Sequence, residues 1–427
     1  MKVPAHHLLR RLAACPIAGL ILYVMSWSIG TAQAVDEAAP RGDAKDPAAL
    51  LWKRIAAGET KLDTSSDRAF LRSLLKELGV PTGSQVLVFS KTSLQKSLIN
   101  PTHPRAIYYN EECYVGSAQG GNIELTAIDP ERGPQYYLIQ RPFTGSAKVG
   151  LVRDRVCMSC HVGGNLQVQS VHADRSGYPL EREDRFVTTY ESPLSERWGG
   201  WYVTGRHAEE FHMGNVPTVV EAGKAFSDRS RGANVETLEL FFDTKPYLAN
   251  SSDIVALMVL EHQYVMQNTF AETGQALRRV LARSRTSASS RESLKRIVGK
   301  YARKINSQLL FAGEYELSHG GVRGEMAFQE AFRRNRRQAS DGSSLKDFDL
   351  QTRLFKYRCS SMIYSASFDA LPEILKQEVY RELRKTLDGT DANPEYDYLG
   401  ENEKKQIMRI LSETKPEAEA LWAAPAP

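Results

Sequence analysis

The spacing of apolar residues changes along the chain in a way that predicts both helices and strands. Residues 49–59 and 65–80 repeat apolar positions every three or four residues, which predicts two helices. Residues 85–140 contain short runs of β-branched and aromatic residues separated by turn residues, which predicts strands. Helical spacing returns after Val235, and its longest run covers residues 251–284.

The predicted strands are joined by links too short for crossover helices, so we expect a small antiparallel sheet. We therefore expect an α+β fold, with N-terminal helices and this sheet, a loop-rich middle segment containing one hairpin, and a mainly α-helical C-terminal half. The expected regions are a signal peptide over 1–34, a flexible linker over 35–48, a mixed α/β region over 49–145, the loop-rich segment over 146–230 and the helical region over 231–427.

The first 34 residues have the three parts of an export signal. Lys2, Arg10 and Arg11 supply positive charge, residues 12–30 are uncharged and mostly apolar, and Ala32-Gln33-Ala34 is a small-x-small cleavage site. Cleavage after Ala34 predicts a periplasmic protein with no membrane span. An uncleaved anchor is the alternative, because the apolar run approaches the ~20 residues that span a bilayer.

The charge balance gives no support for a nucleic-acid partner. The formal net charge is +4, but three of the 55 basic residues precede Ala34, and the remainder nearly balances the 51 acidic residues. The chain is long enough for about two or three domains. The local run Arg333, Arg334, Arg336 and Arg337 is most simply read as a solvated helix face.

One motif in the loop-rich segment indicates specific chemistry. Cys157-Met158-Ser159-Cys160-His161 places two thiols three residues apart, with a histidine directly after the second. Two such thiols, one helical turn apart, can add to the two vinyl groups of a porphyrin, and the adjacent imidazole can then bind the iron. Cys157, Cys160 and His161 are therefore the expected cofactor-binding residues, with His161 as the proximal iron ligand.

On these five residues and the export signal, the chain resembles the c-type cytochromes. The resemblance implies one covalent haem c and a redox function, and it leaves the fold open. Small monohaem carriers are compact helical domains with the motif near their start, whereas here the motif follows ~110 residues of predicted helix and sheet. Most of this chain must therefore have a role besides holding a haem.

Other uses of paired cysteines fit less well. A structural zinc site needs four ligands, and the sequence has neither a second Cys-x-x-Cys nor a His-x-x-x-His. A thioredoxin-like pair follows a strand, whereas Arg153-Asp154-Arg155-Val156 precedes this one. A disulfide within the motif stays open as an alternative.

The sixth ligand decides what a haem iron can do, because a Met or His closes the site and an open face admits small molecules. Met213 and His212 are the favoured distal candidates, since Gly214 and Asn215 allow a tight turn beside them. His172 and His207 are also near in sequence. His262 shares a helix face with Met258 and Met266, a spacing more typical of core packing. His103 and His319 are expected in loops.

Other residues have weaker assignments. Trp198, Trp201 and Tyr202 either contact the porphyrin or form a hairpin core, and the core is favoured. Arg153, Arg155 and Arg175 are candidates for pairing with haem propionates. Cys113 and Cys359 are the remaining cysteines of the mature chain, and an oxidising compartment predicts a disulfide between them.

Two functions remain open. The first is an exported monohaem cytochrome that transfers electrons in the periplasm to or from a redox partner protein or a small molecule. It is motivated by a single haem motif without another catalytic motif. The alternative is a haem enzyme or sensor with an open distal site, peroxidase-like or oxygenase-like, because the chain is far longer than a carrier needs.

Overall fold

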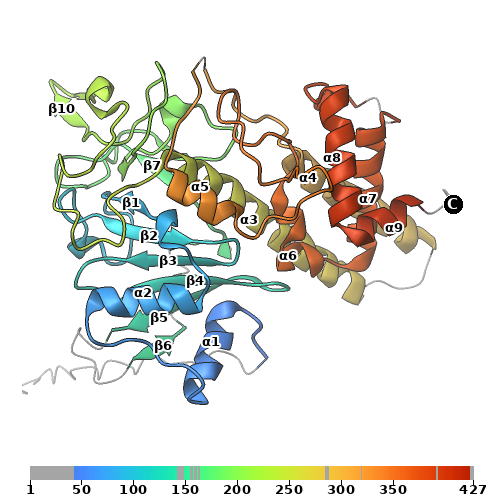
Figure 1. Cartoon of the computed structure of the whole chain (residues 1–427), viewed down its shortest axis with the longest axis horizontal. Helices are drawn as coiled ribbons and strands as arrows, with labels where there is room; N and C mark the ends of the chain where they lie inside the picture. The colour runs from blue at the N-terminus through green and yellow to red at the C-terminus, as the bar shows by residue number, and fades with distance from the viewer. Residues whose placement is uncertain are drawn as a thin grey trace, which may run out of the picture. The chain divides into compact units, whose positions relative to one another are not determined.

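The strands predicted over residues 85–140 form one antiparallel sheet, which β6 and β9 extend at its two edges to the order β6-β5-β4-β3-β2-β1-β9. Figure 1 labels β1 to β6 of this sheet. The chain's α+β class is confirmed by the computed structural model, which describes residues 43–141, 149–153, 157, 161, 164–283, 288–318, 320–390 and 393–423. The strands are β1 (Val86–Val88), β2 (Arg105–Tyr109), β3 (Cys113–Ser117), β4 (Ile123–Asp129), β5 (Gly133–Gln140), β6 (Gly150–Val152) and β9 (Trp201–Tyr202).

Alternation along the strands gives the sheet two different faces. The first face packs on helices α1 (Pro47–Ala56) and α2 (Asp67–Glu77), in a cluster that includes Tyr108, Val115 and Leu125. The opposite face takes the alternate residues of the same strands, including Tyr109 and Tyr114. Because this second face packs with Cys157 and with helix α3 (Ile254–Arg283), we call it the motif face.

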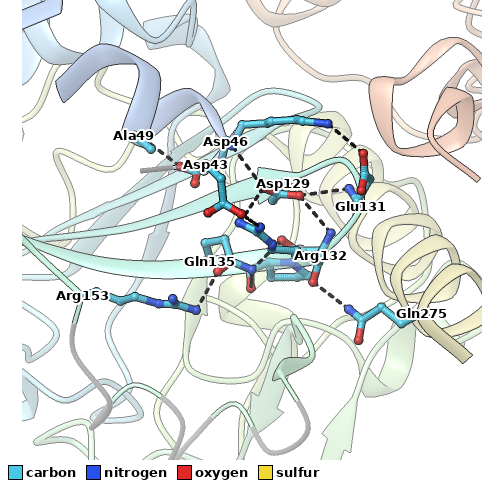
Figure 2. Close-up of polar contacts among 12 residues, drawn as sticks. Asp43, Asp46, Ala49, Asp129, Glu131, Arg132, Gln135, Arg153 and Gln275 are labelled. Carbon is cyan, nitrogen blue, oxygen red and sulfur yellow. Dashed lines mark hydrogen bonds and ion pairs between the residues drawn. The ribbon is translucent and has the colours of Figure 1, made fainter. Parts of the chain in front are cut away.

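The predicted linker over 35–48 ends earlier than expected. Ala44 and Asp46 are buried, and the Asp46 carboxylate accepts a hydrogen bond from the Ala49 amide at 3.0 Å, which caps α1. Figure 2 shows this segment beside the turn between β4 and β5, where Arg132 pairs with Asp43. Residues 43–48 are therefore part of the folded protein, which corrects the linker boundary, while residues 35–42 lie outside the described part of the chain.

The C-terminal half is mainly helical, as expected. Its helices after α3 are α4 (Ala288–Leu309), α5 (Met326–Arg333), α6 (Ala366–Asp369), α7 (Glu373–Asp388), α8 (Glu401–Thr414) and α9 (Pro416–Ala423), of which α7 packs against α4, α8 and α9 (Figure 1). The first half of α3 belongs to the motif-face cluster and its second half to the cluster of C-terminal helices. Helix α3 therefore joins the sheet to the helical half. None of the described helices has the length and apolarity needed to cross a membrane.

The middle segment forms two small hairpins instead of the expected one. Strands β7 (Gln169–Val171) and β8 (Arg185–Val187) make the first, and β10 (Val219–Glu221) and β11 (Lys224–Phe226) the second. Strand β9 joins the main sheet through β1. An ion pair of 2.9 Å between Arg197 and Glu261, both buried, ties this segment to α3.

The predicted disulfide between Cys113 and Cys359 is wrong for this structure. Both cysteines are free thiols and both are fully buried. Cys113 lies on β3 facing α1 and α2, whereas Cys359 lies in the cluster of C-terminal helices. Burial raises the pKa of each thiol, which keeps both protonated.

Candidate haem-binding site

The described ends of the Cys-x-x-Cys-His motif are joined by a hydrogen bond. The His161 amide donates to the Cys157 carbonyl at 3.1 Å, which has the i to i+4 spacing of the bonds in an α-helix. The Cys157 side chain is buried in the motif-face cluster, and His161 is half-buried. Met158, Ser159 and Cys160 lie outside the described residues.

The His161 ring is fixed in one tautomer. Its Nδ1 lies 2.9 Å from the carbonyl oxygen of Asn165, which can only accept, so Nδ1 carries the proton and Nε2 keeps the lone pair. The Tyr136 ring stacks on the imidazole, with ring centroids 4.4 Å apart. Burial lowers the pKa of His161, and this effect exceeds the opposing one of the bond to Asn165. A neutral imidazole bonded to a carbonyl through Nδ1 is a common form of a metal-binding histidine.

The segment after the motif is anchored to both walls of the site. Asn268 on α3 accepts a hydrogen bond from the Leu166 amide and donates one to its carbonyl, each at 2.8 Å. The Tyr136 hydroxyl on β5 donates to the Gly164 carbonyl at 3.0 Å. These bonds hold His161 between the sheet and α3.

Cys157 and His161 both line a hollow that encloses about 880 Å³, part of it open to solvent; we call it the inner hollow. The part of this space that the centre of a water molecule can reach is about 140 Å³. The walls come from the sheet, the segment after the motif and α3. Their apolar and aromatic members are Leu94, Ile107, Tyr114, Leu125, Tyr136, Tyr137, Leu166, Val168, Trp201, Leu260 and Tyr264.

One ion pair lies on the otherwise mostly apolar motif face. Arg105 on β2 reaches Glu124 on β4 at 2.5 Å, although β3 runs between them. The residue of β3 at the crossing is Gly116, where a Cβ atom would lie 2.2 Å from the Arg105 guanidinium. Burial acts to raise the pKa of Glu124, but Arg105 and hydrogen bonds from Ser93 and Gln95 outweigh it and lower that pKa overall. The pair is therefore ionised beside the cysteine and histidine of the motif.

A second hollow adjoins the first and is more basic. The outer hollow, of about 1,300 Å³ including open solvent, shares Arg105, His161 and Trp201 with the inner one. Its other lining residues include Lys91, Lys96 and Arg185, opposed by Glu181. An apolar cavity with a basic mouth matches the two parts of a haem, its macrocycle and its propionates. The described residues therefore fit the cofactor that the motif implies.

The favoured distal candidates lie elsewhere. Neither Met213 nor His212 lines either hollow. Both are buried: the Ser170 hydroxyl lies 3.6 Å from the Met213 sulfur, and the His212 ring packs edge-on against Trp198 at 5.5 Å. The predicted turn does form, with Asn215 at φ 70°, but it packs under residues 197–203 and not over the motif. This placement does not support either residue as a distal ligand.

The other histidine candidates are also engaged away from the hollows. The His207 Nδ1 donates to the Glu210 carbonyl at 2.6 Å, and its Nε2 accepts from the Asn234 amide. His172 lies 3.1 Å from the Thr218 hydroxyl and His262 lies 2.6 Å from the Ser360 hydroxyl. The remaining candidates are Met258 and Met266, which are core residues, His103, which is exposed in a loop as expected, and His319, which lies outside the described residues.

The aromatic and arginine predictions have mixed outcomes. Trp201 lines both hollows, whereas Trp198 and Tyr202 are core residues. Figure 2 shows Arg153 directed to Gln135, whose side-chain oxygen accepts its hydrogen bond at 2.7 Å. Arg175 is exposed and lines neither hollow, and Arg155 lies outside the described residues. The basic residues at the outer hollow are instead Lys91 and Lys96, which lie between β1 and β2, Arg105 on β2 and Arg185 on β8.

Sequence reasoning missed the sheet's part in the site. Arg105, Tyr114, Glu124 and Tyr136 all lie on the motif face, and all line the inner hollow. The signal for two of them was present, since Arg105 and Glu124 are charged residues at positions of β2 and β4 that alternation assigns to one face. Among the described residues there is no group of three or more His, Cys, Asp and Glu side chains that could hold a metal ion by themselves. Comparison with family models, with curated proteins and with solved structures found no match to this chain.

Proposed function

We propose that this chain is an exported monohaem c-type protein of the periplasm, with haem attached to Cys157 and Cys160 and with His161 as the proximal iron ligand. The observation that supports it best is the placement of Cys157 and His161 on one largely apolar hollow. The hydrogen bond between them and the tautomer of His161 add to that support. The haem would supply one-electron redox chemistry, and the chain would set its axial ligand, its hydrogen bonds and its access to solvent.

The first role we propose is electron transfer. It needs a haem edge near the surface, and the adjoining outer hollow is open to solvent beside the half-buried His161. Lys91, Lys96 and Arg185 around that opening would favour an acidic face on a redox partner protein, or an anionic small-molecule donor or acceptor.

The second role, a haem enzyme or sensor, is favoured by one specific observation. Among the described residues lining the two hollows, His161 is the sole histidine and there is no methionine. An electron carrier whose haem iron has a protein side chain as its sixth ligand normally uses a histidine or a methionine there. The walls of the hollow thus favour an iron whose sixth position is accessible.

Covalent haem attachment is tested by expressing the full chain with a c-type haem maturation system and staining a denaturing gel for haem. We expect stain on the wild-type band, a mass increase equal to one haem, and loss of both in the Cys157→Ala/Cys160→Ala double variant. The reason is that only thioether bonds to these two sulfurs survive denaturation.

The matched control is Cys113→Ala, which removes a fully buried thiol facing away from the hollow. It should keep the stain and the added mass. Wild-type protein that matures without covalent haem, alongside a control cytochrome that matures normally, would refute the proposed function.

A further inference from the structure

The inner hollow has four tyrosines, and three of their hydroxyl groups are committed to other partners. Tyr136 donates to the Gly164 carbonyl at 3.0 Å, and Tyr264 to the Thr188 carbonyl at 2.5 Å. Tyr137 donates to the Asp46 carboxylate at 2.8 Å on the other side of the sheet. Each of these bonds fixes a wall of the site and leaves its hydroxyl unavailable to a ligand.

Tyr114 is different. Its side chain lines the inner hollow, only 8% of the residue is exposed, and its hydroxyl is buried without a hydrogen-bond partner among the residues that the structure describes. Leaving a buried hydroxyl unsatisfied typically costs about 1–3 kcal/mol, so native proteins seldom do so without a reason. Burial also raises the pKa of Tyr114, with Glu111 adding to the effect, which keeps the hydroxyl a neutral donor and disfavours the tyrosinate that would bind iron.

The position of Tyr114 relative to His161 follows from the register of the sheet. Tyr114 on β3 pairs with Thr126 on β4, which pairs with Tyr136 on β5, and Tyr136 stacks on the His161 ring. Two strand spacings, about 10 Å, therefore separate Tyr114 from the tyrosine that supports the proximal histidine. All three side chains line one hollow, so Tyr114 and His161 border the same space.

The charged donor of the motif face, Arg105, cannot take this role as easily. Arg105 is held by Glu124 at 2.5 Å, and Glu124 is itself bonded to Ser93 and Gln95 at 2.7 and 3.1 Å. Moving the guanidinium toward a ligand would break a partly buried ion pair. Tyr114 can donate without breaking any bond.

We propose that the hollow leaves the sixth position of the haem iron to a small diatomic ligand, and that the Tyr114 hydroxyl donates a hydrogen bond to this ligand. This inference rests on the proposed haem attachment and develops the second of the two roles. The class of ligand follows from the chemistry of the donor, since a neutral hydroxyl in a hollow with mostly apolar and aromatic walls suits a compact acceptor such as dioxygen or nitric oxide.

The test uses the full-length haem-loaded protein with two probes, fluoride for the ferric state and carbon monoxide for the ferrous state. We expect a high-spin ferric spectrum and binding of carbon monoxide by the reduced protein. Tyr114→Phe, which removes only the hydroxyl, should weaken fluoride binding by about tenfold, because hydrogen bonds to charged groups exceed the energy of neutral ones. It should also raise the C–O stretching frequency, because a donor at the ligand lowers it.

The matched control is Tyr108→Phe, on the neighbouring strand and facing the opposite side of the sheet, whose hydroxyl is bonded to Gln85. It should leave both probes unchanged. In the wild-type protein, transfer to deuterium oxide should shift the C–O band if a hydroxyl donates to the ligand, which tests the bond even if Tyr114→Phe does not fold.

Two results would overturn the inference while haem attachment stands. A low-spin, six-coordinate spectrum in both oxidation states without added ligand would mean that the protein fills the sixth position. Equal fluoride affinity and an equal C–O frequency in wild type and Tyr114→Phe would mean that Tyr114 does not face the ligand. A wild-type protein without haem stain would instead refute the proposed function itself.

Discussion

Arg105 can reach Glu124 across an intervening strand because the residue between them has no side chain. An ideal Cβ atom at Gly116 would lie 2.2 Å from one guanidinium nitrogen of Arg105 and 2.7 Å from its central carbon. Real Cβ atoms do not approach other heavy atoms this closely, so the guanidinium would have to move. A glycine in a strand usually weakens it, and here it makes room for an ion pair on the floor of the site.

Gly116→Ala should therefore displace Arg105 and lower the free energy of unfolding by about 1–3 kcal/mol, the usual cost of overpacking. The measurement is urea unfolding of wild type, Gly116→Ala, Arg105→Ala and the double variant. In the Arg105→Ala background the cost of Gly116→Ala should largely disappear, because the clashing group is gone.

Gly150→Ala is the control for this cycle. Gly150 lies on β6 of the same sheet, and a Cβ atom there would meet only the Gln140 side chain at 3.4 Å, an ordinary contact. Gly150→Ala should change the free energy of unfolding by no more than about 0.5 kcal/mol, as most substitutions do where no close contact is disturbed. A cost of Gly116→Ala that is the same with and without Arg105 would show that the glycine has another role.

At the residue scale the sequence predicted local chemistry better than long-range contacts. The motif residues Cys157 and His161 line one hollow and are joined by a hydrogen bond, as their closeness in sequence allows. Met213 is near the motif in sequence, but nearness in sequence says little about whether a side chain lies near the motif in the folded protein. Tyr114 had no local signal, because its unpartnered hydroxyl depends on contacts made by other strands and by α3.

At the scale of elements, periodicity predicted the sheet and the long helix α3 and failed where pairing is non-local. β9 is two residues long and joins the sheet at its far edge, so no run of alternating residues marks it. The linker prediction failed at Asp46 for a related reason. Its carboxylate caps α1 and accepts a hydrogen bond from Tyr137, 91 positions away.

Helix α3 also sets a limit on acid stability. His262 on this helix is fully buried, its Nδ1 has no hydrogen-bond partner in the described part of the chain, and burial lowers its pKa from 6.5 to about 3. Below pH 6.5 the unfolded chain gains a proton that the folded protein does not, so this residue's contribution to stability is complete above pH 6.5 and is lost as pH falls toward 3. Each pH unit in this interval costs about 1.4 kcal/mol for one such group.

His262→Gln removes this titration and keeps a polar group for the Ser360 hydroxyl, which lies 2.6 Å from the imidazole. Between pH 6.5 and 4.5 the variant should lose about 2–3 kcal/mol less stability than wild type, as measured by urea unfolding at each pH. His103→Gln, in an exposed loop, should follow the wild-type pH profile. A His262→Gln profile parallel to wild type would mean that His262 is already protonated, or already accessible, in the folded protein.

At the scale of the whole molecule, three hydrophobic clusters divide the described residues. One lies between the sheet and helices α1 and α2, the second contains Cys157 on the motif face, and the third holds the C-terminal helices. Most of the buried residues that line the inner hollow, including Tyr114, Tyr136 and Leu166, belong to the second cluster, and none of them belongs to the third. A haem in that hollow would complete this cluster and leave the third one untouched.

Removal of the haem should therefore loosen the molecule unevenly. In the Cys157→Ala/Cys160→Ala protein, amide hydrogen exchange should speed up in β3, β4, β5 and residues 164–171, while α7, α8 and α9 exchange as in the haem-loaded protein. The reason is that local opening reflects local packing, and a bound cofactor stabilises most strongly the residues it contacts. Haem-loaded Cys113→Ala, which alters the sheet from its other face, should match the haem-loaded wild type around the hollow. Faster amide exchange spread equally over the sheet and the C-terminal helices would contradict this division. It would mean that the clusters open as one unit and that α3 transmits the loss of the haem from the sheet to the C-terminal helices.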